Sequence, residues 1–131
     1  MTVNRYMILI LAALLLAACS TVTTRKSSGE EVTMTQEEFA KYVEHIFRYH
    51  NQVMAELIES ASDQPEHSEK LFQELTKAEK QMVTVCEPLN EVVTESLAGE
   101  SIGLTLKMKL AEAAPACESA TQIVDKLLTD Q

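Results

Sequence analysis

The chain has 131 residues, with 11 Lys and Arg against 20 Asp and Glu and a formal net charge of −9 at pH 7. This length is typical of a single domain. Binding to nucleic acid requires clustered positive charge, so the composition argues against that role, and it argues equally against direct adhesion to anionic lipid. The acidity serves either solubility or a partner protein with a basic surface.

The first nineteen residues form an apolar segment with a charged start. Arg5 precedes an apolar run from Met7 to Ala18, and Cys19 follows this run directly. As a helix the run is about 18 Å long, whereas the hydrocarbon core of a bilayer is about 30 Å thick, so a spanning helix is not expected. An ordinary secretory signal ending in an Ala-x-Ala-like site is one interpretation.

The end of this segment, Leu16-Ala17-Ala18-Cys19, resembles the lipobox of bacterial lipoprotein signal peptides. The resemblance implies that residues 1–18 are a signal peptide and that Cys19 is lipidated on its thiol and on its new amino group, with acyl chains such as palmitate. Three acyl chains are enough for stable anchoring. Ser20 follows the cysteine where an Asp would favour the inner membrane, so we expect an anchor at the periplasmic face of the outer membrane.

Residues 19–33 are small and polar, and they show no hydrophobic period. Such a composition predicts a flexible lipidated tether with a reach of roughly 20 Å. No segment of the chain is predicted to be a strand.

Residues 34–131 are predicted to form a helical bundle domain. The first helix, about 35–62, starts at a capping box of Thr35 and Glu38, and i,i+4 pairs link Glu37 to Lys41 and Glu44 to Arg48. Further helices are expected at about 66–98, ending at Gly99, and at about 102–129. Apolar residues recur every three or four positions in all three helices, and the stripes are Phe39, Val43, Ile46, His50, Val53 and Leu57; Leu71, Leu75, Ala78, Met82, Val85, Leu89 and Val92; and Leu106, Leu110, Ala113, Cys117, Ala120, Val124 and Leu127.

These patterns predict an all-α fold, an antiparallel up-down-up three-helix bundle with kinked second and third helices and one disulfide. If Cys19 is lipidated, Cys86 and Cys117 remain as a pair in an oxidising periplasm, where they are expected to join. In an antiparallel pair of helices, two residues at the same height have residue numbers that add up to a constant. The numbers of Cys86 and Cys117 add up to the same value as those of Pro88 and Pro115, so each pair is expected to lie at one height. A redox or metal role for the cysteines is the alternative, although the chain has no Cys-x-x-Cys motif.

Three sets of polar residues are candidates for function. His50 lies within an apolar stripe and is either a pH-sensitive switch or a hydrogen-bonded core residue. Tyr42, His45 and Tyr49 form a row that is either a recognition patch or the edge of the core. One face of the second predicted helix carries Glu87, Glu91 and Glu95. This row is interpreted either as a solvated surface or as a docking stripe for a basic partner, and a divalent-metal site is a third alternative.

No enzyme motif is present, no cofactor or metal site is predicted, and we expect a non-enzymatic protein. The predicted function is a lipid-anchored adaptor or assembly factor that binds another envelope protein. The general plan is similar to that of secretin pilotins, which are small helical lipoproteins, and this similarity covers architecture only. The alternatives are a carrier or sensor of a small apolar ligand, and a purely structural envelope lipoprotein.

Overall fold

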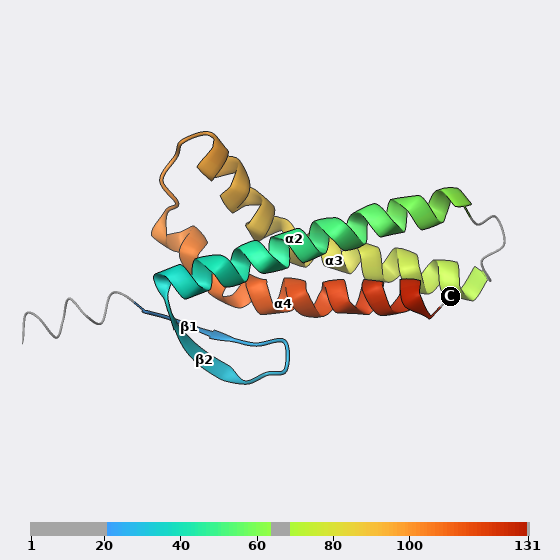
Figure 1. Cartoon of the computed structure of the whole chain (residues 1–131), viewed down its shortest axis with the longest axis horizontal. Helices are drawn as coiled ribbons and strands as arrows, with labels where there is room; N and C mark the ends of the chain where they lie inside the picture. Colours follow the sequence, from blue (N-terminus) through green and yellow to red (C-terminus); the bar gives the residue numbers. More distant parts are fainter. Residues whose placement is uncertain (1–20, 64–68, 131) are drawn as a thin grey trace, which may run out of the picture.

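A computed structural model describes residues 21–63 and 69–130, which fold as a β-hairpin followed by three long helices (Figure 1). The hairpin consists of β1 (Thr21–Arg25) and β2 (Glu31–Thr35), and the helices are α2 (Gln36–Asp63), α3 (Glu69–Leu97) and α4 (Leu104–Thr129). The helices run up, down and up, as predicted, and their bounds lie close to the predicted ones. The predicted signal peptide, Cys19 and the predicted start of the second helix lie outside the described residues.

Helix α2 begins where the capping box predicted. The Thr35 backbone N–H donates to Glu38 Oε2 at 2.8 Å, and the Glu38 N–H donates to Thr35 Oγ1 at 3.2 Å. These bonds satisfy donors that the first helical turn leaves without partners. The pKa of Glu38 lies below its usual value, mainly because its carboxylate accepts the backbone N–H of Thr35 and then the Thr35 hydroxyl. The two predicted ion pairs, Glu37–Lys41 and Glu44–Arg48, both form at 2.7 Å on the exposed face.

The predicted apolar stripes form the core, and α4 occupies its centre. Helix α4 packs extensively on α3 and also on α2, whereas α2 and α3 touch each other only slightly. Ala114 and Thr121 of α4 are fully buried and were not among the predicted core positions. The buried stripe residues are Phe39, Ile46, His50, Val53 and Leu57 of α2, Leu75, Met82 and Leu89 of α3, and Leu106, Leu110, Cys117, Ala120 and Val124 of α4.

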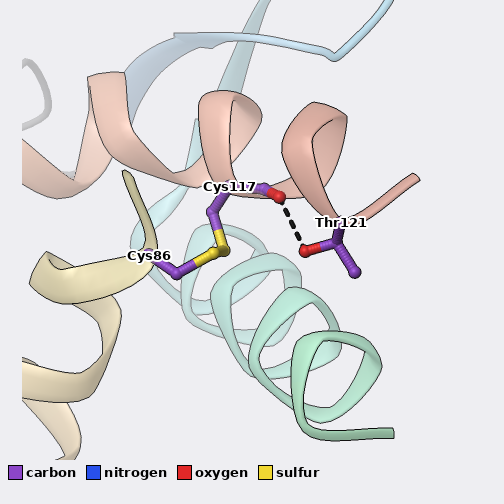
Figure 2. Close-up of a disulfide and its surroundings, with 3 residues drawn as sticks. All are labelled: Cys86, Cys117 and Thr121. Atoms are coloured by element: carbon purple, nitrogen blue, oxygen red, sulfur yellow. Dashed lines mark hydrogen bonds between the residues drawn. A yellow bond between two sulfur atoms is a disulfide. The ribbon is translucent and has the colours of Figure 1, made fainter. Parts of the chain in front are cut away.

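The predicted disulfide joins α3 to α4 at the middle of this core. Cys86 and Cys117 are bonded, their Cα atoms are 4.8 Å apart, and neither side chain is exposed (Figure 2). Thr121, one turn further along α4, turns its hydroxyl back to the Cys117 carbonyl oxygen at 2.8 Å. Closing a loop of this size stabilises a folded domain by roughly 3–4 kcal/mol in the chain-entropy model.

Helix α3 changes direction along its length, and its last part, drawn in gold, points away from α2 and α4 (Figure 1). Pro88 lies inside this helix, two residues after Cys86, and a proline within a helix removes one backbone hydrogen bond and favours a bend. The helix ends at Leu97, and Gly99 forms the C-terminal turn, as predicted. Gly99 has φ 74, its N–H donates to the Ser96 carbonyl, and the Glu100 N–H donates to the Glu95 carbonyl, which is the Schellman pattern.

The prediction of a flexible tether without strands is wrong from residue 21 onward. Strands β1 and β2 pair in antiparallel fashion from Thr21↔Thr35 to Arg25↔Glu31, and the turn between them places Gly29 at φ 88. Alternating Val and Thr residues and a Ser-Ser-Gly turn were the local signals for a hairpin. Tertiary packing decides the outcome, because Val22 and Met34 on one face of the hairpin lie against the helical core.

The hairpin is attached to α4 at the second proline. Pro115 has no N–H, so the Ala111 carbonyl four residues earlier has no helical donor. The Thr24 hydroxyl, on the buried face of β1, donates a hydrogen bond to this oxygen. A strand residue thus satisfies the carbonyl that the proline in α4 leaves open.

We predict that Thr24→Val lowers the free energy of unfolding by about 1–3 kcal/mol, because the half-buried Ala111 carbonyl then loses its donor. Pro115→Ala restores a backbone N–H that can donate to the Ala111 carbonyl. In a protein that carries Pro115→Ala, Thr24→Val should therefore lower the free energy of unfolding by at least about 1 kcal/mol less than it does in the wild type. Urea unfolding of the four proteins gives this coupling energy. The matched control is Thr23→Val on the exposed face of β1, with an expected effect within about 0.5 kcal/mol. Additive effects would show that the hydroxyl does not replace the missing helical bond.

Candidate functional site

The tyrosine row joins α2 to α4. The Tyr42 hydroxyl donates to Glu118 at 2.8 Å, and the Tyr49 hydroxyl donates to Asp125 at 2.6 Å. Both pairs span the same sequence separation, as expected for two parallel helices in constant register. Burial first, and then the bond to the carboxylate, raises the pKa of each tyrosine well above its usual value. The structure therefore favours the core-edge interpretation for these two residues.

His45, between the two tyrosines in sequence, is exposed on α2. The acidic row on α3 is also at the surface, since Glu87 and Glu91 are exposed and Glu95 is half-buried. Among the described residues, the one cluster of side chains close enough to hold a metal ion does not include these glutamates. The row stays a predicted docking surface, and its metal-binding interpretation receives no support.

An apolar groove lies between the first half of α2, the last part of α3 and the start of α4. Its volume is about 440 Å³, within the range of ligand-binding pockets. The aromatic rings of Phe39 and Phe47 line it from α2, and Val92 and Val93 line it from α3 beyond Pro88. Polar groups are confined to a few positions, and the remaining lining residues are Val22, Gln36, Ala40, Val43, Glu44, Ser96, Ile102, Lys107 and Leu110.

The bend in α3 accounts for this groove. Helix α3 stays close to α4 up to the disulfide, but its last part leaves the bundle (Figure 1), so Val43 and Val92 keep part of their surface exposed. Leu97 is 84% exposed and Leu104 is 75% exposed, and both stand within two residues of the groove in sequence. Val43 and Val92 pack against the core, as the apolar stripes predicted, and Pro88 was the one signal in the sequence that they would also line an open groove.

A second hollow of about 640 Å³ lies at the opposite end of the bundle, between α2 and α3. Ile58 and Phe72 expose apolar surface there, but Glu69, Gln73 and Glu79 also line it. Its lining includes Ala61 and Glu69, and residues 64–68 between them in sequence lie outside the described part of the chain. The groove beside Val92 is the more uniformly apolar of the two.

His50 is buried, with 5% of its surface exposed, and it lies beside the disulfide. Its Nδ1 atom has no hydrogen-bond partner, so the prediction of a hydrogen-bonded core residue is not supported at this nitrogen. Burial lowers the pKa of the imidazole below its usual value. The sequence shows no ligand near the cysteines, because His50 is far from both in sequence and only the packing of three helices brings them together.

We predict that stability falls as the pH drops below about 6.5, because His50 binds a proton in the unfolded chain before it does so in the folded protein. A base whose folded pKa is lowered contributes full stability above the unfolded pKa and loses it as the pH falls towards the folded value. Urea unfolding at pH 7.5 and 5.5 measures this change above the titration range of ordinary carboxylates. In His50→Leu the free energy of unfolding should fall less between pH 7.5 and 5.5 than in the wild type. In His45→Leu, which changes an exposed histidine, it should fall as much as in the wild type. Equal pH dependence in the two variants would contradict this assignment.

The described residues thus offer an open apolar groove and a buried cluster of one histidine with a disulfide. None of their helices has both the length and the apolar character needed to cross a bilayer. The chain matches no protein-family model, no curated protein and no solved structure.

Proposed function

We propose that this protein is a lipid-anchored, non-enzymatic adaptor or assembly factor that binds an envelope protein through the apolar groove between α2, α3 and α4. The observation that carries the proposal is the groove itself, which is wide, open and lined by aromatic and aliphatic side chains with few polar groups. Amphipathic helices bind in such grooves through apolar side chains at helical spacing. The expected location is the periplasmic face of the outer membrane.

The hairpin changes the expected geometry of the anchor. One residue, Ser20, separates the proposed lipidation site at Cys19 from the first residue of β1. Two Cα–Cα steps span at most about 8 Å, so the folded domain would be held directly beside the bilayer and not on a long tether. Val22 in β1 lines the groove, only three residues after the proposed anchor. This proximity favours a partner that is itself in the membrane or at its surface.

Charge indicates which kind of helix would bind. Without residues 1–18 the chain has ten Lys and Arg against twenty Asp and Glu, so the domain is strongly acidic. Glu91 and Glu95 lie on α3 within two residues in sequence of the groove residues Val92 and Val93. A partner helix with an apolar face and a basic flank fits this surface, because opposite charges at the rim speed association and suppress wrong partners.

A carrier or sensor of a small apolar ligand is the second candidate, and the same groove favours it. Its volume would accommodate a single small molecule or one acyl chain. The two candidates differ in what fills the groove, and that can be measured directly.

We predict that Cys19→Ser releases the protein from the membrane fraction, since the remaining chain is acidic and the lipid is its proposed anchor. Fractionation and intact-mass measurement after expression in a bacterium provide the test. The wild-type protein should start at residue 19, carry the mass of three acyl chains and remain in the membrane pellet. A membrane-bound Cys19→Ser protein, or wild type without added lipid mass, would refute the lipid anchor.

We predict that a photoreactive amino acid placed at Ser96 forms a cross-link of discrete mass to one polypeptide in intact cells. Val93→Glu should abolish this cross-link, because a carboxylate in the groove excludes an apolar side chain. Val83→Glu is the matched control, since Val83 is an exposed valine of the same helix that does not line the groove, and it should leave the cross-link intact. An apolar small molecule that co-purifies, with no polypeptide cross-linked, would refute the adaptor and support the carrier.

A further inference from the structure

Three helices each contribute one potential metal ligand to a single point in the core. The atoms are a ring nitrogen of His50 from α2, Sγ of Cys86 from α3 and Sγ of Cys117 from α4, and all of them lie within 4.8 Å of one another. His50 is 5% exposed, and both cysteines are fully buried. This is the one such group among residues 21–63 and 69–130.

The disulfide by itself does not account for His50. A buried polar atom without a partner lowers stability by about 1–3 kcal/mol, and His50 Nδ1 is the one buried side-chain nitrogen or oxygen in the described residues that has none. An apolar residue would fill this position in the helix stripe without that cost. The imidazole therefore has a nitrogen without a hydrogen-bond partner, and one of its two ring nitrogens lies within 4.8 Å of both sulfurs.

We propose that reduction of the Cys86–Cys117 disulfide converts this cluster into a three-ligand site for a thiophilic d10 cation, Zn(II) or Cu(I). Two thiolates and a neutral imidazole are typical ligands for these ions. Ligand atoms about 2.0–2.3 Å from a metal in a trigonal arrangement are about 4 Å apart. Once the sulfur–sulfur bond is broken, small side-chain rotations would bring all three atoms to this spacing.

The reaction requires a reductant, which in the cell envelope would be a protein dithiol. The dithiol transfers two electrons and two protons to the disulfide, which becomes two thiols, while the dithiol itself becomes a disulfide. The cation then replaces both thiol protons, which leave to solvent. The proposal is independent of the adaptor function, because it concerns the core and not the groove.

The two cations suit the site for different reasons. With Zn(II) the two thiolates and the neutral imidazole give a complex without net charge, which lowers the cost of burial. With Cu(I) the complex is anionic, but three soft ligands satisfy the ion without a fourth, whereas Zn(II) in proteins usually takes four. Separate titrations with the two ions therefore identify the cation.

The test uses the full chain in detergent, with Cys19→Ser to remove the third thiol, in oxidised form and after reduction with a trialkylphosphine. The phosphine takes its oxygen from water and becomes a phosphine oxide, so no competing thiol is added. Zn(II) and Cu(I) are titrated separately against chromophoric chelators, and far-UV circular dichroism follows the helix content. We expect the reduced protein to bind one equivalent and the oxidised protein to bind none.

His50→Leu should weaken binding by the reduced protein at least tenfold, and His45→Leu, a histidine of the same helix outside the cluster, should not. His50→Leu removes an unpartnered polar atom, so its oxidised form should keep the helix content of the parent. If reduction alone unfolds the helices, the cation should restore them in the parent but not in His50→Leu. Absence of stoichiometric binding of either ion, or equal affinity in both histidine variants, would overturn the proposal.

Discussion

The disulfide between Cys86 and Cys117 fixes the position of α3 relative to α4 along the bundle. The two prolines, the attachment of the hairpin and the apolar groove all depend on this link. Pro88 lies two residues after the first cysteine and Pro115 two residues before the second, so both helices lose a backbone hydrogen bond at the same level of the bundle. A domain of about 110 residues has a net stability of only several kcal/mol. Because the disulfide joins α3 and α4 at this level, both helices can lose a backbone hydrogen bond there and still stay packed together.

The two prolines have different structural consequences. At Pro115 the Thr24 hydroxyl of the hairpin satisfies the open carbonyl of Ala111, so the irregularity becomes an attachment site for β1. At Pro88 the helix bends, and its last turns leave the bundle (Figure 1). Pro115 therefore provides the attachment of the N-terminal hairpin to the core, whereas Pro88 opens the apolar groove.

Together the two irregularities place the groove and the hairpin on the same part of the molecule. Val22 of β1 and Val92 of α3 line the same groove, although seventy residues separate them in sequence. If Cys19 carries lipid, the short connection to β1 would bring this groove close to the bilayer. The polar ties Tyr42–Glu118 and Tyr49–Asp125 hold α2 in register with α4 along the opposite edge of the interface.

The sequence by itself determined the helices, their direction, their caps and the disulfide, because each depends on local spacing or on a pair of cysteines. Thr35 and Glu38 form a capping box wherever a helix follows, and Gly99 can adopt the positive φ that ends α3. Tertiary structure decided the rest. Residues 21–35 carry short hairpin signals that two isolated strands cannot turn into a stable structure, and the core completed the hairpin by offering an apolar face and an open carbonyl. Val92 became a groove residue because the bend at Pro88 changes the position of every later residue of α3. His50 lies beside the disulfide because three helices pack at one level, and no spacing within a single segment of the sequence reveals this contact.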